Sequence, residues 1–196
     1  MFLLISGEKI MINIENLNIS YDDKEVIKNF NEHIQKGEKI ALFGQSGIGK
    51  TSLINALMGL VDYSGVINCN EALEYAVVFQ EDRLLSDFTV FDNVKITAKG
   101  YNNAEITNYI QSFNLNPKAL ISTLSGGMKR RVAILRAILA PANLVILDEP
   151  FKGLDADTKE KVMSLVKEKT SDKTMIIITH DLSEARFFDC RIIELS

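Results

Sequence analysis

The chain has 196 residues, of which 46% are hydrophobic, so it is long enough for one domain with a core of its own. Its net charge of −4 excludes bulk attraction to nucleic acid or anionic lipid, and no stretch reaches the ~18–20 apolar residues of a membrane helix. We therefore expect a cytosolic protein. Cys69 and Cys190 lack metal or redox spacing, and we expect them to be small buried residues in a reducing compartment.

The N-terminal segment has two interpretations: residues 2–5 form an edge strand, or residues 1–10 are an extension ahead of a second start codon. From residue 11 to residue 21 apolar and polar residues alternate, with one slip near Asn16, which predicts a half-buried strand. After a short turn, a second strand is predicted over residues 26–34.

The central motif is a glycine-rich loop between a predicted strand at residues 39–43 and a predicted helix at residues 51–58. It fits the pattern G-x-x-x-x-G-K-[ST] and consists of Gly44, Gln45, Ser46, Gly47, Ile48, Gly49, Lys50 and Thr51. The glycines let backbone N–H groups approach a phosphate, and the helix N-terminus presents its positive end to the same anion. We expect Lys50 to face the β and γ phosphates of a nucleotide, Thr51 to bind Mg²⁺ and Ser52 to extend the nucleotide contact. The alternative is a glycine-rich turn before an ordinary helix.

The middle of the chain has a helical character, after short predicted strands at residues 66–67 and 75–79. Between about residues 84 and 140 apolar residues recur at helical spacing without a strong strand, which predicts an α-helical subdomain inserted in the core. Thr89 is a candidate helix cap. The predicted helices cover residues 90–98, 104–113 and 127–139.

Strand–helix alternation then resumes and continues to the end of the chain. Strands are predicted at residues 143–147, 174–178 and 191–195, with helices at 156–170 and 182–187. This order predicts an α/β fold: a P-loop NTPase core with a mostly parallel sheet, an antiparallel N-terminal β-subdomain and the inserted helical subdomain. We expect residues 1–196 to form a single domain of this kind.

An apolar predicted strand ends in two carboxylates, Asp148 and Glu149. A buried parallel strand delivers its last residues to the ligand-binding edge of the sheet. We expect Asp148 to hold Mg²⁺ and Glu149 to orient or deprotonate the water that attacks the γ-phosphorus. The alternative is an acid pair that caps the segment after the strand, because Pro150 and a loop follow.

Two further polar residues stand just after predicted strands. Gln80 is placed to reach Mg²⁺ or the attacking water, and the alternative is a solvated strand end. His180 is placed to donate a hydrogen bond to the γ-phosphate, and the alternative is a structural histidine.

The segment Leu124-Ser125-Gly126-Gly127 opens a helix, with Ser125 as a good N-cap and two glycines that leave N–H groups exposed. Lys129 and Arg130 add positive charge nearby. One interpretation is an ordinary capped helix with a basic first turn. The other is a second anion-binding helix start that meets a nucleotide held by another chain.

Together these motifs resemble the ATP-binding subunit of an ABC transporter. In this family Walker A (here residues 44–51), the LSGG signature (124–127), Walker B (144–149) and the switch histidine (His180) occur in this order. The resemblance covers nearly the whole chain. It implies that Tyr21 stacks on adenine, that Gln80 is the glutamine at the border of the helical subdomain, and that Asp155 lies in the loop crossing the dimer seam. It also implies a head-to-tail dimer with two ATP molecules between Walker A of one subunit and LSGG of the other.

Residues 79–94 are similar to the corresponding stretch of nitrate/sulfonate/taurine-type importers, with four departures. Asp82 stands where a proline is usual, no tryptophan follows Leu85, Arg130 replaces a common glutamine, and Lys152 replaces a small residue. The chain also ends soon after His180, which argues against a C-terminal regulatory domain.

We thus expect an ATPase subunit at the inner face of the membrane that dimerises on ATP, as a homodimer, and drives separate permease subunits. An extracytoplasmic solute-binding protein would complete the system. The alternatives are a ribosome- or DNA-associated ABC ATPase and a nucleotide-dependent switch. Leu84, Leu85 and Phe88 either form a docking surface for the permease or belong to the core of the helical subdomain.

Overall fold

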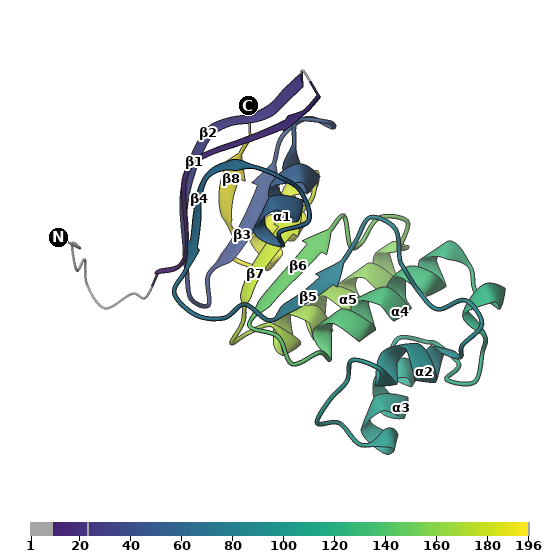
Figure 1. Cartoon of the computed structure of the whole chain (residues 1–196). Helices are drawn as coiled ribbons and strands as arrows, with labels where there is room; N and C mark the ends of the chain where they lie inside the picture. Colours follow the sequence, from purple (N-terminus) through teal and green to yellow (C-terminus); the bar gives the residue numbers. More distant parts are fainter. Residues whose placement is uncertain (1–9, 23, 196) are drawn as a thin grey trace. The chain divides into compact units, whose positions relative to one another are not determined.

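The computed structural model describes residues 10–22 and 24–195 (Figure 1). The chain separates into two compact units. Among the described residues, unit 1 comprises residues 10–73, without residue 23, and 173–195, and unit 2 comprises residues 74–172. The strand or extension predicted within residues 1–10 lies almost wholly outside the described residues. In the described part of the chain, no helix is long and apolar enough to cross a membrane.

Unit 1 contains a three-stranded antiparallel sheet in which β1 (Ile10–Tyr21) lies between β2 (Lys24–Gln35) and β4 (Ser64–Cys69). This is the predicted N-terminal β-subdomain. The slip in the alternation near Asn16 corresponds to a bulge, because the register with β2 shifts between Ile14 and Leu17.

Asn16 has a φ of 49°. A Cβ at Gly65 would lie only 2.3 Å from the carbonyl oxygen of Asn16. Any side chain at Gly65 would therefore collide with the bulge, which explains why a glycine stands at the start of β4. The strand predicted at residues 66–67 is longer than expected, because β4 begins at Ser64 and ends at Cys69.

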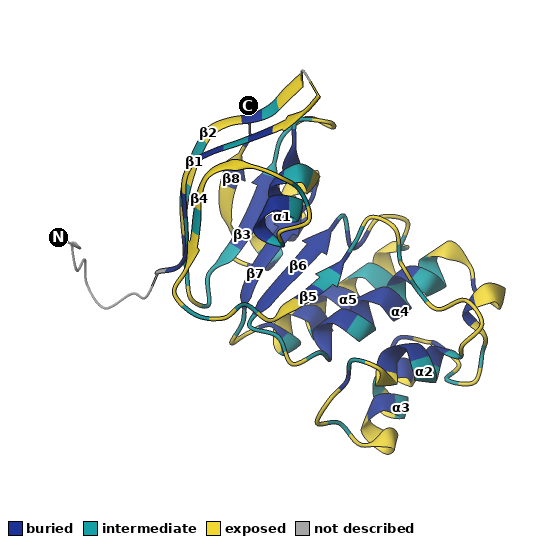
Figure 2. Cartoon of the chain, viewed as in Figure 1, coloured by how far each residue is buried: buried dark blue, intermediate teal, exposed yellow. Residues whose placement is uncertain are grey.

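The second layer of unit 1 is parallel. Strand β3 (Lys39–Phe43) lies between β7 (Thr174–Ile178) and β8 (Arg191–Glu194). All five residues of β7 are buried (Figure 2), which matches the continuous apolar run in its sequence. Helix α1 (Lys50–Leu57) follows β3, and helix α6 (Leu182–Phe187) follows β7.

Unit 2 contains a parallel pair of strands, β5 (Tyr75–Val78) and β6 (Leu144–Asp148), with Val78 in register with Leu147. The segment between them in sequence is helical, as predicted. Its elements are α2 (Val90–Lys95), α3 (Asn103–Ser112), the 3-10 turn η1 (Ile121–Thr123) and α4 (Gly126–Ile138), and α5 (Ala156–Lys169) follows β6.

The helix starts in unit 2 are set by local capping. Thr89 forms a reciprocal capping box with Asp92, which confirms the predicted cap and fixes the start of α2. Asn102 does the same with Glu105 at the start of α3. Helix α2 ends at Lys95, three residues before the predicted end at residue 98.

The prediction for the cysteines was wrong. Cys69 is exposed and Cys190 is only half-buried. Cys69 is the last residue of β4, which is an edge strand of the three-stranded sheet, so little of the chain covers its side chain.

Candidate active site

The glycine-rich loop of unit 1 has the backbone that its sequence predicts. Gly44 follows β3 with a φ of 144°, and a Cβ at this position would lie 2.7 Å from the carbonyl oxygen of Leu195. Gly49 is the N-cap of α1 with a φ of 110°, and a Cβ there would lie 2.8 Å from side-chain atoms of both Val26 and Ile27. The loop conformation therefore depends on these two glycines.

Lys50 is only 7% exposed, and its side chain folds back over the loop. Its Nζ donates hydrogen bonds to the carbonyl oxygens of Gly44, at 2.7 Å, and Gln45, at 2.9 Å. Helix α1 has no side-chain cap and no acidic residue in its first turn, so nothing negative from that turn competes for its positive end. An ammonium group within a curved loop at a helix N-terminus suits an anion such as a phosphate.

His180 lies at the same strand edge as the loop, because Ile178 of β7 is in register with Leu42 of β3. The preceding Thr179 is buried and donates a hydrogen bond to Glu184 Oε2 at 2.5 Å. Asp181 caps α6 by accepting a hydrogen bond from the Ser183 N–H at 2.8 Å. The exposed His180 thus lies between two anchored neighbours.

Tyr21, the predicted adenine-stacking residue, ends β1 with 42% of its surface exposed. Its hydroxyl donates a hydrogen bond to Ser52 Oγ at 3.3 Å. This contact brings together two predicted nucleotide-binding residues, and the exposed ring is available for stacking. The loop residues Gln45, Ser46 and Gly47 are exposed, as is the hydroxyl-bearing Thr51.

In unit 2 the second group of site residues lies at the ends of β5 and β6. Val78 of β5 is in register with Leu147 of β6. Gln80 and Glu149 each follow these paired residues by two positions, so they leave the strand pair at the same end. Asp148 is the buried last residue of β6. Glu149 has a φ of 45°, a left-handed conformation that costs about 1–3 kcal/mol for a residue other than glycine.

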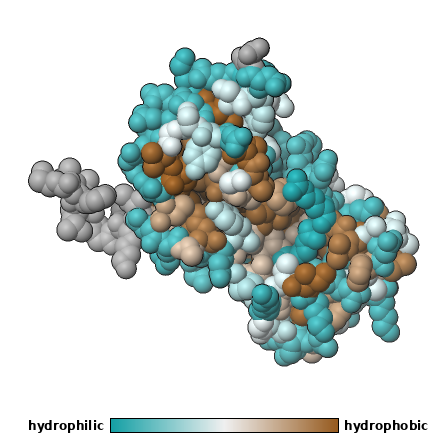
Figure 3. Space-filling model, in the orientation of Figure 1, coloured by the Kyte–Doolittle hydropathy of each residue, from teal (hydrophilic) through white to brown (hydrophobic). Residues whose placement is uncertain are grey.

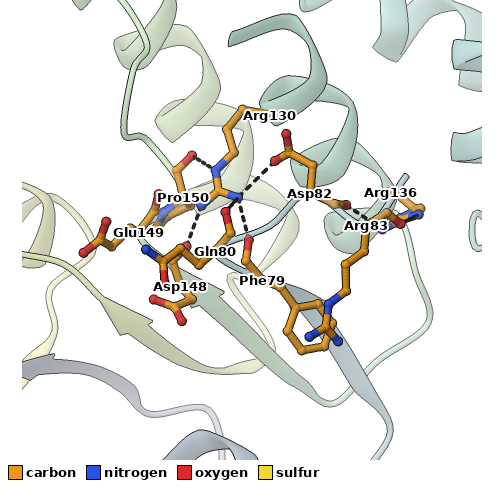
Figure 4. A network of polar contacts seen from close by, with 9 residues as sticks. All are labelled: Phe79, Gln80, Asp82, Arg83, Arg130, Arg136, Asp148, Glu149 and Pro150. Atoms are coloured by element: carbon orange, nitrogen blue, oxygen red, sulfur yellow. Dashed lines mark hydrogen bonds and ion pairs between the residues drawn. The ribbon is translucent and has the colours of Figure 1, made fainter. Parts of the chain in front are cut away.

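Arg130 is the residue that joins these strand ends (Figure 4). Its side chain is 7% exposed, and its guanidinium contacts two backbone segments and one carboxylate. Nε donates to Pro150 O at 3.1 Å; Nη1 donates to Phe79 O at 2.5 Å, Gln80 O at 3.4 Å and Asp82 Oδ1 at 3.1 Å; Nη2 donates to Asp148 O at 2.6 Å and Glu149 O at 2.7 Å.

Arg130 was expected to add charge near another chain's phosphate, and the structure directs its guanidinium to acceptors within its own unit. The contacts of Arg130 could not be derived from the sequence. A signal was nevertheless present, since Arg130 and its ion-pair partner Asp82 are both departures from the family pattern.

Lys152, a further departure, contacts the proposed base. Its Nζ lies 2.6 Å from Glu149 Oε2, and its side chain is 70% exposed. A pocket of about 160 Å³ lies beside this ion pair, lined by Gln80, Asp82, Gly126, Arg130, Glu149 and Lys152. The end of β6 and the start of α4 therefore border one small cavity.

The LSGG segment starts α4 as predicted. Ser125 is the exposed N-cap, and its Oγ accepts a hydrogen bond from the Met128 N–H at 3.3 Å. At Gly127 a Cβ would lie 3.4 Å from the carbonyl oxygen of Gly153, so the helix start passes close to the loop after β6. In the same loop, the Thr158 N–H donates to Asp155 Oδ1 at 3.0 Å. This bond, with one from the Thr158 hydroxyl, holds the pKa of the Asp155 carboxyl below its ordinary value.

Comparison with known proteins gives consistent results. The model of the family described as "ABC transporter" matches residues 27–152. PEB1C of Campylobacter jejuni, a probable ABC transporter ATP-binding protein, is 33% identical over 93% of this chain and 86% of its own length. The taurine import ATP-binding protein TauB of Escherichia coli is 34% identical over 95% of this chain and 80% of its own length. The aliphatic sulfonates import ATP-binding protein SsuB 1 of Paracoccus denitrificans is 34% identical over 93% of this chain and 78% of its own length.

Among solved structures, the chain is similar to the ATP-binding cassette MJ0796 in a dimeric, post-hydrolysis state bound to ADP and Pi. The TM-score is 0.82 at 26% sequence identity, and the alignment covers 95% of this chain and 94% of that chain.

Proposed function

Because this chain belongs to the ABC transporter family, we propose that it is the ATP-hydrolysing subunit of a transporter and that the residues described above carry out its ATPase cycle. The main support is the coincidence of motif and geometry. In unit 1 the phosphate loop and His180 share one strand edge, and in unit 2 Gln80 and Glu149 share another. Parallel strands deliver ligand-binding and catalytic groups at such edges.

Binding of ATP is assigned to unit 1. The loop N–H groups and Lys50 hold the β and γ phosphates, and Tyr21 stacks on the adenine. Mg²⁺, when bound, neutralises charge on the phosphates. The Thr51 hydroxyl, the Asp148 carboxylate and the Gln80 amide are oxygen donors of the kind that Mg²⁺ prefers, and one carboxylate plus substrate phosphates is a usual set for this ion.

Hydrolysis is assigned to Glu149, which orients the attacking water and accepts its proton. His180 donates a hydrogen bond to the γ-phosphate and so distinguishes ATP from ADP. Gln80 orients the water or the ion. After hydrolysis, phosphate and a proton are released and ADP remains in the phosphate loop. Loss of the γ-phosphate removes its contacts with the second subunit, which hold the dimer closed.

The signature segment acts on the nucleotide of a second chain. In a head-to-tail homodimer, Ser125 and the N–H groups of Gly126 and Gly127 contact the γ-phosphate held by Lys50 of the other subunit, and Asp155 lies at the seam. The exposed N-terminus of α4 supports this assignment, since it offers a positive helix end. We keep the interpretation of residues 1–196 as one such domain, with residues 84–140 as its helical subdomain.

The permease is expected to dock on unit 2 at the inner face of the membrane. Leu85 and Phe88 are 43% and 50% exposed and Leu84 is half-buried, so the interpretation as buried core is wrong for the first two. Leu120 is also exposed and forms a β-bridge with Thr89, next to Phe88. Hydrophobic surface over α2 and α4 is visible in Figure 3. An exposed apolar surface of this kind suits a partner helix.

The names of the sulfonate and taurine relatives favour import. An extracytoplasmic solute-binding protein is part of the proposal as the component that would deliver the solute. The names do not favour a ribosome- or DNA-associated role. The acidic net charge of −4 agrees with this choice.

The composite site can be tested by mixing two inactive variants, Lys50→Ala and Ser125→Arg. Each homodimer lacks one element at both of its sites, so neither should hydrolyse ATP. A mixed dimer retains one site with both elements, and it should regain ATP-dependent dimerisation and part of the ATPase activity. Ser122→Arg, at an exposed serine three positions earlier, is the matched control and should stay active alone.

Folding of each variant is checked by circular dichroism, and subunit exchange by labelled chains. If exchange occurs but the mixture regains neither dimerisation nor ATPase activity, Ser125 does not act on the nucleotide of the other chain.

A further inference from the structure

Arg130 uses its whole guanidinium on the two segments that carry Gln80 and Glu149. All three nitrogens donate, and the acceptors include backbone carbonyls from both the turn after β5 and the segment after β6 (Figure 4). Arginine has five N–H donors in a planar fork, whereas lysine has three donors on one atom and glutamine has a single NH₂ group. Neither lysine nor glutamine has enough donors for all the carbonyl and carboxylate oxygens that Arg130 contacts in the two segments.

Both segments have backbone conformations that need such support. Glu149 and Arg83 have φ values of 45°, in the left-handed region that is unfavourable for side chains of this size. Arg136, six residues after Arg130 on α4, donates to the carbonyl oxygens of Arg83, at 2.9 Å, and Asp82, at 3.1 Å. The side chain of Arg83 in turn stacks over the ring of Phe79, 3.7 Å from its centroid. Helix α4 therefore fixes the entire turn from Phe79 to Arg83.

Asp82 supplies the negative charge in this cluster. Among the partners of Arg130 named above, Asp82 is the one carboxylate, and its Oδ1 lies 3.1 Å from Arg130 Nη1. A buried cation without a counter-charge is strongly unfavourable, so the pair is expected to act as a unit. A proline, which the resemblance to importers leads us to expect at position 82, would offer no such charge.

We propose that Arg130 is a positioning residue for ATP hydrolysis: with Asp82 as counter-charge, it locks the Gln80 turn and the Glu149 strand end to the helix that starts at Ser125. The proposal rests on the roles given to Gln80 and Glu149 in the proposed function. It adds a physical connection between them. The proposed docking residues Leu84 and Leu85 follow Arg83 directly. A permease that displaces them would therefore also move the turn at Gln80, and Arg130 would transmit this movement to Glu149.

The test compares Arg130→Gln and Arg130→Lys with wild type in the full chain, at saturating ATP. We expect kcat to fall by about 10²-fold in both, since displacement of a catalytic group by ~1 Å has an effect of this order. The Kd for ATP, measured by calorimetry, should change by less than about two-fold, because the phosphate loop belongs to unit 1. Arg186→Gln, at an exposed arginine of α6, is the matched control and should match wild type in both values.

A purely structural role predicts a different result. The melting temperature would fall, but kcat per folded molecule would stay within about three-fold of wild type, and that outcome would overturn the proposal. If Arg130→Gln does not fold, Arg130→Lys keeps the charge and most of the volume, and its kcat decides in the same way.

Asp82 gives an independent test through a double-mutant cycle. Asp82→Asn keeps the shape of the side chain and should lower kcat several-fold in the wild-type background, whereas Asp82→Glu should retain most activity. In the Arg130→Gln background Asp82→Asn should have no further effect, because the charge that it balances is gone. Additive effects of the two substitutions would show that the residues do not act together.

Glu149→Gln, measured in parallel, separates this proposal from the proposed function. If Glu149→Gln loses turnover while both Arg130 variants keep it, the positioning role is wrong and the assignment of Glu149 stands. If Glu149→Gln hydrolyses ATP at the wild-type rate, Glu149 is not the base, so the role proposed for Arg130 in positioning it fails together with the assignment of Glu149.

Discussion

The candidate site residues of unit 1 and those of unit 2 are held in place in different ways. In unit 1 Lys50 bonds to carbonyl oxygens only five and six positions away, and the loop is shaped by glycines within the motif itself. In unit 2 Arg130 reaches Asp148, 18 positions away, and Phe79, 51 positions away. The proposed phosphate-binding residues of unit 1 thus form a local structure, whereas the proposed hydrolytic residues of unit 2 depend on one long-range side chain. A short motif specifies the first, and the packing of a whole unit specifies the second.

This difference predicts that substitutions in the two groups of residues affect different quantities. Changes in the phosphate loop should act mainly on ATP affinity. Changes around Glu149 should act mainly on turnover, with affinity retained.

The largest effect is expected for Glu149→Gln, which keeps the shape of the side chain and removes the base. General-base catalysis contributes about 10²–10⁴-fold in rate, so kcat should fall by this factor while ATP still binds and the closed dimer accumulates. Single-turnover hydrolysis and gel filtration with ATP measure the two effects. Glu160→Gln, at an exposed position of α5, is the control. Wild-type turnover in Glu149→Gln would transfer the role of base to another residue, with His180 the first candidate.

Lys50→Ala should act on the other group. A hydrogen bond to a charged group contributes about 1.5–3 kcal/mol, so ATP affinity should fall by roughly 10- to 150-fold, and hydrolysis should be lost with it. Calorimetry with ATP measures the affinity, and Lys99→Ala, at an exposed lysine, should bind as wild type does. Near-normal turnover in Lys50→Ala would mean that the loop is not the catalytic site and would remove the basis of the comparison.

Tyr21→Ala should give a smaller loss of affinity. Aromatic stacking contributes about 0.5–1.5 kcal/mol beyond area burial, so the Kd for ATP should rise several-fold with kcat largely kept. Tyr21→Phe is the matched control, because it keeps the ring and removes only the hydrogen bond to Ser52. Unchanged affinity in Tyr21→Ala would limit the role of this ring to the sheet edge.

The smallest effect is expected for Lys152→Ala. Because Lys152 is 70% exposed, its ion pair with Glu149 should contribute about 0–1 kcal/mol. Release of Glu149 from this pair should raise kcat by less than about five-fold, and the difference from wild type should vanish near 1 M salt, where exposed charges are screened. Lys152→Arg retains the charge and should behave as wild type. A large loss of activity in Lys152→Ala would instead mean that this lysine contacts the nucleotide or the attacking water.

The sequence by itself determined the order of strands and helices, the phosphate loop and the helix caps at Thr89 and Ser125. These features depend on hydrophobic periodicity and on contacts within a few residues, which a sequence displays directly. The slip in the alternation near Asn16 likewise marks the position of the bulge in β1, because an extra residue in a strand interrupts its two-residue period.

Only the tertiary structure decided where Arg130 points, that Asp82 balances its charge, and that Leu85, Phe88 and Cys69 are exposed. Each of these outcomes depends on which distant segments cover a side chain, and residue type does not encode this. An arginine near the start of a helix has the same local sequence pattern whether it faces solvent or crosses a buried strand end. The packing of β5, β6 and α4 within unit 2 selected the buried arrangement, because the strand ends there present carbonyl groups that need donors.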